Sequence, residues 1–269
     1  MGLRVTTIRV VGLLAAGGWL WGQGVARAQV TISTTAVADA FVRSADATHN
    51  YGGAGALSVS GTMATNAGGV QQGAFDSFIR FDISGTVAQF NANFGNGGWT
   101  IFSANLLLTE TAAPANAIFN RGVGQFEVRW IANDSWSEGN GTPTAPNTSG
   151  IVYNDEPSAL SAGQDTALGL FANGGTNGLD TFPLSTPPAF LSDIGAGGMV
   201  SLYLTATVGS AVGFTFNSHE FGTASQRPLL QLTAVAIPEP MTFALVGLSL
   251  VTLVALHRVR RKSGHVEVD

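Results

Sequence analysis

Three side chains that could donate oxygen ligands lie within twelve residues of one another in the sequence, near the start of the chain. Asp39, Asp46 and Asn50 stand before or at the glycine-rich stretch NYGGAGA. Carboxylate, amide and backbone carbonyl oxygens are the ligands that Ca²⁺ prefers, so these residues form a candidate Ca²⁺ site. The spacing is not that of an EF-hand, and the alternative is an Asx-turn loop that satisfies its own backbone. The chain has no Cys and no His cluster that would predict zinc.

Catalytic chemistry has weaker support. Ser218, His219 and Glu220 are consecutive, whereas a nucleophile and its base meet through the fold rather than as neighbours on a strand. Two carboxylates facing each other across a cleft could hydrolyse a glycoside, but no motif distinguishes such a pair. We therefore expect a protein that is not an enzyme, with a glycan-degrading enzyme as an alternative. The acids considered for that alternative are Glu127, Asp134, Glu138, Asp155 and Glu156.

Aromatic residues in polar stretches are candidates for glycan binding. Sugar rings stack on exposed aromatic side chains beside hydrogen-bonding groups. Tyr51, Trp136 and Tyr153 lie in such stretches, whereas Trp130 alternates with Phe126 and is expected in the core. For any one of the three candidates, a place in the core is the alternative.

Apolar and polar residues alternate with a period of two through much of the chain, which predicts β-strands. The candidate residues are therefore expected on strands or in the loops between them. Clusters rich in Gly, Asn, Ser, Thr and Pro separate the alternating runs and predict turns. We expect an all-β fold, a single β-sandwich of the jelly-roll type spanning residues 29–236. No helix is expected outside the two ends, and the polar loop 138–150 is expected to be mobile. The alternating runs are SFIRFDI, QFEVRW, SLYLTATV, GFTFNS and LLQLTAV.

The first 28 residues predict a signal peptide. Arg4 and Arg9 precede or border an apolar run, and Ala26 and Ala28 are small residues where signal peptidase selects them. Cleavage is expected after Ala28, so signal peptidase is a predicted partner. An uncleaved N-terminal anchor is the alternative.

The last segment, residues 237–269, predicts a membrane helix. Residues 241–256 carry no charge and would form a helix about 24 Å long, against a hydrocarbon core of about 30 Å. Basic side chains can snorkel and let so short a helix span the membrane, and they favour the cytoplasmic side. A buried core helix is the alternative. The basic residues that follow are Arg258, Arg260, Arg261 and Lys262.

The exported region is strongly acidic. Between Gln29 and Pro240 there are five Arg, no Lys and fifteen Asp or Glu, a formal balance of −10. Nucleic acids and polyanionic glycans are bound through Lys and Arg. The charge therefore argues against nucleic acid as a partner and does not favour an acidic polysaccharide.

The C-terminal segment resembles a PEP-CTERM sorting signal. Pro238, Glu239 and Pro240 precede the apolar run, and the basic cluster follows it, in the order typical of that family. The resemblance implies a Gram-negative bacterium that makes exopolysaccharide and processing by exosortase, a membrane protease. It also implies a precursor in the inner membrane and a final location in the outer envelope, at the cell surface or in the extracellular matrix.

The exported region resembles a DNRLRE-type domain. The matching pieces follow one another from Ala38 to Val235, although the usual Thr-Trp strand is replaced by IVYNDEPS after a longer loop. That family implies a secreted β-sandwich related to carbohydrate-binding modules. We therefore expect a structural or glycan-associated protein of exopolysaccharide or biofilm, with a carbohydrate-binding module for a specific polysaccharide as the alternative. The pieces are DAFVRSADATHNYGGAGALSVS, SFIRFDIS, SANLLLT, WSEG and RPLLQLT.

Overall fold

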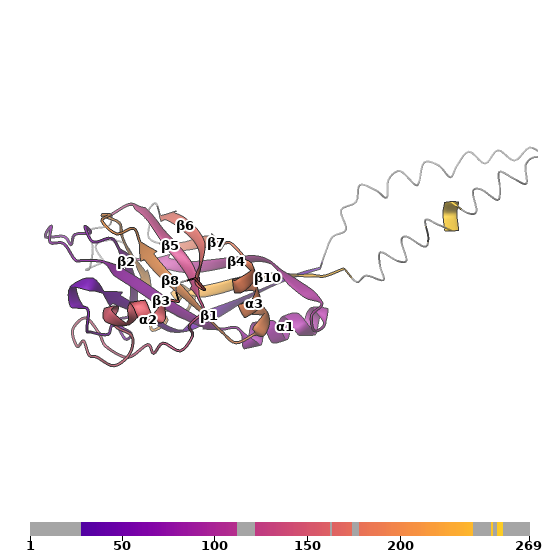
Figure 1. The fold of residues 1–269 in the computed structure, drawn as a ribbon, viewed down its shortest axis with the longest axis horizontal. Coiled ribbons are helices and arrows are strands. Elements are labelled where there is room, and N and C mark those ends of the chain that lie inside the picture. The colour runs from indigo at the N-terminus through magenta and orange to yellow at the C-terminus, as the bar shows by residue number, and fades with distance from the viewer. Residues whose placement is uncertain are drawn as a thin grey trace, which may run out of the picture.

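The part of the chain that the structure describes folds into ten β-strands and three short α-helices, with further helical residues at 249 and 252–254 (Figure 1). The computed structural model describes residues 28–111, 122–161, 163–173 and 178–238, together with Ser249 and residues 252–254. The strands are β1 (Gln29–Arg43), β2 (Ala56–Ser60), β3 (Phe75–Asp82), β4 (Trp99–Glu110), β5 (Gly124–Ile131), β6 (Thr166–Asn173), β7 (Gly178–Leu184), β8 (Met199–Ala206), β9 (Gly213–Asn217) and β10 (Leu229–Ala236). The helices are α1 (Ser84–Phe94), α2 (Glu156–Ala159) and α3 (Pro188–Ala196).

Strand β1 belongs to both layers of this sandwich-like fold. Its first half pairs with β10, and after a register shift between Ala36 and Ala38 its second half pairs with β3. One layer continues from β10 to β4 and β7, and the other from β3 to β8, β5 and β6. Strands β2 and β9 pair with each other and close the path between the layers. All these pairings are antiparallel, which confirms the all-β fold expected from the sequence.

The main core lies between the two layers. Alternate residues of β3, β8 and β5 face it, among them Ile79, Leu202 and Val128, and they meet Leu106 of β4 and Leu232 of β10. All five are fully buried. The period-two alternation in the sequence thus identified the inward faces of these strands correctly.

Two helices contradict the expectation that helices would be confined to the ends of the chain. In α1 the buried residues include Val87 and Phe90, and in α3 they are Phe190 and Ile194. Each helix therefore contributes only one short apolar stripe to the core, with the spacing of three or four residues that a helix requires. So short a stripe is hard to distinguish from a loop in sequence.

The outward face of β3 and β8 is also buried, which alternation alone does not predict. Phe78 and Tyr203 point away from the main core, yet they are 0% and 4% exposed. They pack with Trp136, Ile151 and other residues of a long segment that crosses this face. A second, smaller core therefore lies outside the sheet.

Several predicted features lie outside the described residues. These are the signal peptide up to Arg27, with Ala26, and the sorting residues Glu239, Pro240, Arg258, Arg260, Arg261 and Lys262. Ala28 and Pro238 are described, next to the start of β1 and the end of β10. Within the described part of the chain, none of the helices is long and apolar enough to cross a membrane.

Candidate functional site

Trp136 fixes the segment that crosses the outer face of β3 and β8. Its ring packs on Phe78 with centroids 5.7 Å apart, and its Nε1 donates a 3.0 Å hydrogen bond to Ser201 Oγ. Only 6% of Trp136 is exposed, while its neighbours Ser135 and Ser137 face solvent. Insertion of this one ring therefore holds an otherwise polar segment against the sheet.

Arg80 of β3 binds the backbone of the same segment. Its Nη1 donates to the backbone carbonyls of Asp134 at 2.7 Å and Trp136 at 2.8 Å. The guanidinium carbon also lies 4.7 Å from the centre of a Trp136 ring, within the range of a cation–π contact. The guanidinium thus satisfies two carbonyls of a segment that pairs with no strand at this point.

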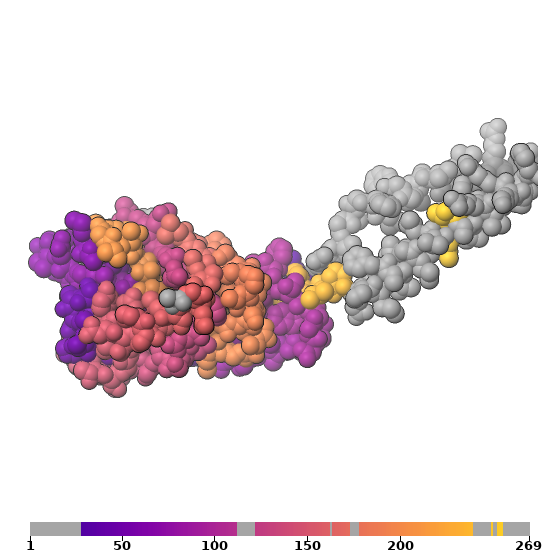
Figure 2. Space-filling view, in the orientation of Figure 1, coloured from indigo at the N-terminus to yellow at the C-terminus, as the bar shows by residue number. Residues whose placement is uncertain are grey.

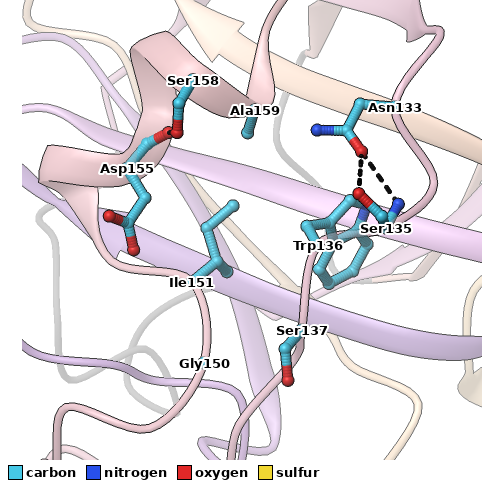
Figure 3. A pocket seen from close by; sticks show the side chains of 9 residues that line it. All are labelled: Asn133, Ser135, Trp136, Ser137, Gly150, Ile151, Asp155, Ser158 and Ala159. Carbon is cyan, nitrogen blue, oxygen red and sulfur yellow. Dashed lines mark hydrogen bonds between the residues drawn. The ribbon is translucent and has the colours of Figure 1, made fainter.

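A hollow opens between this segment and α2. Its volume is about 290 Å³. Figure 3 shows Ile151, Asp155 and Ser158 on one side of it, and Trp136, Ser135 and Asn133 on the other. Asn133 Oδ1 accepts hydrogen bonds from the N–H and the hydroxyl of Ser135, which fixes one rim. The full lining is Asn133, Ser135, Trp136, Ser137, Gly150, Ile151, Asp155, Ser158 and Ala159.

Asn50 holds the loop that forms the lower rim. Its Nδ2 donates to the carbonyls of Glu138 at 2.6 Å and Ile151 at 2.8 Å. Its Oδ1 accepts from the N–H groups of Gly52 and Gly141 at 3.1 and 3.0 Å. The side chain is completely buried. One amide thus joins the two ends of loop 138–150 to residues 50–52, while the mobility of the loop stays a prediction.

Gly139 lets the loop approach Asn50. Its φ is +78°, in the left-handed region that favours glycine. A Cβ at this position would lie 1.9 Å from the carbonyl oxygen of Ser149 and 2.3 Å from Asn50 Oδ1. A side chain would therefore displace the amide that fixes the loop.

A second hollow shares α2 and lies over β5 and β8. It has a volume of about 450 Å³ and is lined by Arg129, Tyr203 and Leu160, among others. Beneath α2 the hydroxyl of Tyr203 donates to Glu156 Oε1. Burial raises the pKa of Glu156 and, with the nearby Glu156 carboxylate, raises that of Asp76 to about 7. Two acidic side chains, Asp76 of β3 and Glu156 of α2, thus lie near each other beneath α2. The space-filling view shows the surface formed by the α2 region, in pink to salmon, away from the end of β10 (Figure 2).

Four titratable side chains form a separate cluster beside loop 138–150. Asp39 of β1, Glu138, His219 and Glu220 offer ligand atoms that all lie within 4.8 Å of one another. Burial raises the pKa of Asp39 to about 6, against the lowering effect of His219. Burial alone would lower the pKa of His219, but the three carboxylates around it raise that pKa to about 12. Electrostatics therefore favour a cation at the centre of this cluster.

The predicted calcium residues have different surroundings. Asp39 lies in the cluster just described, whereas Asp46 accepts hydrogen bonds from Tyr51 and contacts His49. The Asn50 amide is saturated by backbone groups. The spacing in sequence therefore did not indicate which side chains meet: Asp39 instead joins Glu138, His219 and Glu220.

The predicted glycan-binding aromatics are not exposed platforms. Tyr51 is 4% exposed and stacks on Phe41 at 4.7 Å, and Trp136 is 6% exposed. Tyr153 is half-buried against the outer core. The alternative, a place in the core, describes these three side chains better than an exposed platform does. Trp136 nevertheless lines the hollow with the small part of its surface that stays exposed.

Ser218 and His219, which are neighbours in the chain, make separate side-chain contacts. Ser218 Oγ donates to Glu220 Oε2 at 2.7 Å rather than to His219, and Ser218 is buried. Among the described residues this trio thus shows no nucleophile activated by a base.

The family model of carbohydrate-binding module family 96 matches residues 30–159. This chain carries a carbohydrate-binding-like domain. All nine residues that line the first hollow lie inside the matched range, which ends at the last residue of α2. No curated protein matches the chain.

The carbohydrate-binding-like domain supports the alternative that the sequence offered for function. The similarity is to a family of binding modules, which agrees with the expectation of a protein that is not an enzyme. Sequence reasoning overlooked the hollow, because Asn133, Ser135, Ser137 and Ser158 read as ordinary loop residues. The one available signal was a tryptophan isolated between serines.

Proposed function

We propose that the protein binds carbohydrate in the hollow between Trp136 and α2. The observation that carries the proposal is that the family match covers the entire lining of this hollow. Ligand sites combine an apolar wall with a few placed polar groups. Here Trp136, Ile151 and Ala159 supply the apolar wall, and the serine hydroxyls and the Asn133 amide supply donors and acceptors.

The size of the hollow limits the ligand. At about 290 Å³ it lies at the lower end of the range of about 300–1,000 Å³ for small-molecule sites. It fits one sugar unit, such as a chain end or a side branch, better than a flat crystalline surface, which needs an exposed aromatic row. Since the exported region has a formal balance of −10, a neutral glycan is favoured over an acidic one.

A blocking substitution tests the site. Ser137 is exposed and lines the hollow. The Ile151 N–H donates to the backbone carbonyl of Ser137, which a side-chain substitution keeps. We expect Ser137→Tyr to fill the hollow without unfolding the protein and to weaken glycan binding at least about tenfold. The measurement is binding of the purified full chain to an array of neutral and acidic polysaccharides, followed by titration of the best ligand.

Ser149→Tyr is the matched control. Ser149 is exposed in the same loop but is not part of the lining. This variant should bind like the unmodified chain. Equal binding by Ser137→Tyr and the unmodified chain would place the site elsewhere. Failure of every glycan to bind would remove the proposed function.

We also propose that the protein is exported and sorted to the envelope or the extracellular matrix. The support comes from the N-terminal segment, with Ala26 and Ala28, and from the order of the Pro238–Pro240 tripeptide, the apolar run and the basic cluster. A glycan-binding domain on an acidic, cysteine-free chain is compatible with a place within exopolysaccharide or biofilm.

A pair of tags tests the sorting proposal in the native host. If a protease cleaves at the tripeptide, a tag after Asp269 should disappear from the mature protein while a tag within residues 142–146 persists. Glu239→Ala should slow that loss, because it removes the only charge of the tripeptide. Retention of the terminal tag throughout a pulse-chase experiment would instead indicate a plain C-terminal anchor.

A further inference from the structure

The cluster of Asp39, Glu138, His219 and Glu220 brings together residues from distant parts of the chain. Asp39 lies in β1, Glu138 opens the loop that borders the hollow, and the other two follow β9. His219 Nδ1 lies 3.0 Å from Glu220 Oε1, 3.1 Å from Glu138 Oε1 and 3.6 Å from Asp39 Oδ2. Three carboxylates thus surround one imidazole nitrogen.

Backbone N–H groups and a hydroxyl group donate hydrogen bonds that orient the three carboxylates. The N–H of His219 donates to Asp39 Oδ2 at 2.7 Å, and the N–H of Asp39 donates to Glu138 Oε1 at 2.7 Å. The Ser218 hydroxyl donates to Glu220 Oε2 at 2.7 Å. Such outer contacts are typical of metal sites, where they fix the orientation of the ligands.

Asp39 carries an unsatisfied atom. Its side chain is 1% exposed, and its Oδ1 has no hydrogen-bond partner among the described residues. Its other oxygen is the one that lies near His219. A buried carboxylate with an unpartnered oxygen is costly, and a cation held by the Asp39 carboxylate would lower that cost.

Charge also leaves the cluster incomplete. Three carboxylates with one imidazolium carry a net charge of −2. The same carboxylates with a divalent cation and a neutral imidazole carry −1. In a half-buried place the second arrangement leaves less uncompensated charge.

We propose that these four residues bind a zinc ion. Zinc takes Asp or Glu oxygens and His nitrogens at about 2.0–2.2 Å in a tetrahedron, which sets the ligand atoms about 3.3–3.5 Å apart. The distances of 3.0, 3.1 and 3.6 Å from Nδ1 fall on either side of that value. Calcium requires six to eight oxygens, whereas the cluster provides four side chains, one of which contributes nitrogen.

The test is metal titration of the purified full chain after treatment with a chelator. Addition of ZnCl₂ should give one bound ion per chain in calorimetry and should raise the melting temperature, because the ion binds only the folded state. His219→Gln should weaken zinc affinity at least about 100-fold, since loss of an outer contact alone costs 10–100-fold. Glu220→Gln, at the exposed edge of the cluster, gives a second variant with less effect on folding.

His49→Gln is the matched control, because His49 contacts Asp46 outside the cluster. It should leave both stoichiometry and affinity unchanged. Loss of zinc binding in His49→Gln but not in His219→Gln or Glu220→Gln would overturn the proposal. Stabilisation by CaCl₂ and not by ZnCl₂ would overturn the choice of metal. No response to either metal would overturn the metal site, and the protonated His219 would then be the cation that balances the three carboxylates. None of these outcomes depends on whether the hollow binds a glycan.

Discussion

The Asn50→Ala variant is expected to lose about 4 kcal/mol of free energy of unfolding. The buried amide makes four hydrogen bonds to backbone groups of Gly52, Glu138, Gly141 and Ile151. A hydrogen bond contributes about 1 kcal/mol on average, and removal of one partner leaves the other unsatisfied. Urea unfolding followed by tryptophan fluorescence measures the loss.

Asn147→Ala is the control for this loss. Asn147 lies in the same loop, but its side chain bonds to Asn140 and to Ser149 N–H at exposed positions. Its replacement should cost less than about 1 kcal/mol. Asn50→Asp should cost at least as much as Asn50→Ala, because its second carboxylate oxygen would face the two carbonyl oxygens to which Nδ2 now donates, in a fully buried place. Equal stability of the Asn50 and Asn147 alanine variants would show that the loop does not depend on the amide.

Phe126→Ala is expected to destabilise the main core by about 3–5 kcal/mol, the range for loss of a buried aromatic side chain. Phe126 is completely buried. Its ring lies 5.2–6.2 Å from the rings of four others, which come from β6, β7 and β9. These neighbours are Phe171, Phe182, Phe214 and Phe216. One substitution therefore leaves a cavity among elements of both layers, and thermal and urea unfolding should both record it.

The matched control is Phe102→Ala on β4. Phe102 is 65% exposed, so its removal should change the free energy of unfolding by no more than about 0.5 kcal/mol. A similar loss in the two variants would mean that the rings around Phe126 do not form one packed unit.

Alternation in the sequence predicted the inward faces of the strands because each strand lies against one large core. Ile79, Leu202 and Val128 follow this pattern and are buried as expected. Phe78 and Tyr203 do not follow it, since their burial depends on a covering segment more than fifty residues away from Phe78. Local periodicity carries no information about such a cover.

The candidate sites were harder to predict for the same reason. His219 and Glu220 are neighbours in the chain, but Asp39 and Glu138 reach them only through the pairing of β1 and the placement of the loop. Asp46, which lies closer to Asp39 in sequence, bonds to Tyr51 instead. Trp136 looked exposed because its neighbours are serines, and they are indeed exposed while the ring turns inward.

The central place of β10 determines how the domain carries mechanical load. On one side β10 pairs with β1, from the pair Leu229 and Thr35 to the pair Val235 and Gln29. On the other side residues Leu229 to Ala236 of β10 pair with β4. Hydrogen bonds of antiparallel ladders run perpendicular to the strands. Tension applied lengthwise through the C-terminal end of β10 must therefore shear two ladders at once. Tension that separates Gln29 from Val235 acts across one ladder and opens its bonds one after another, so the domain resists the first kind of pull far better than the second.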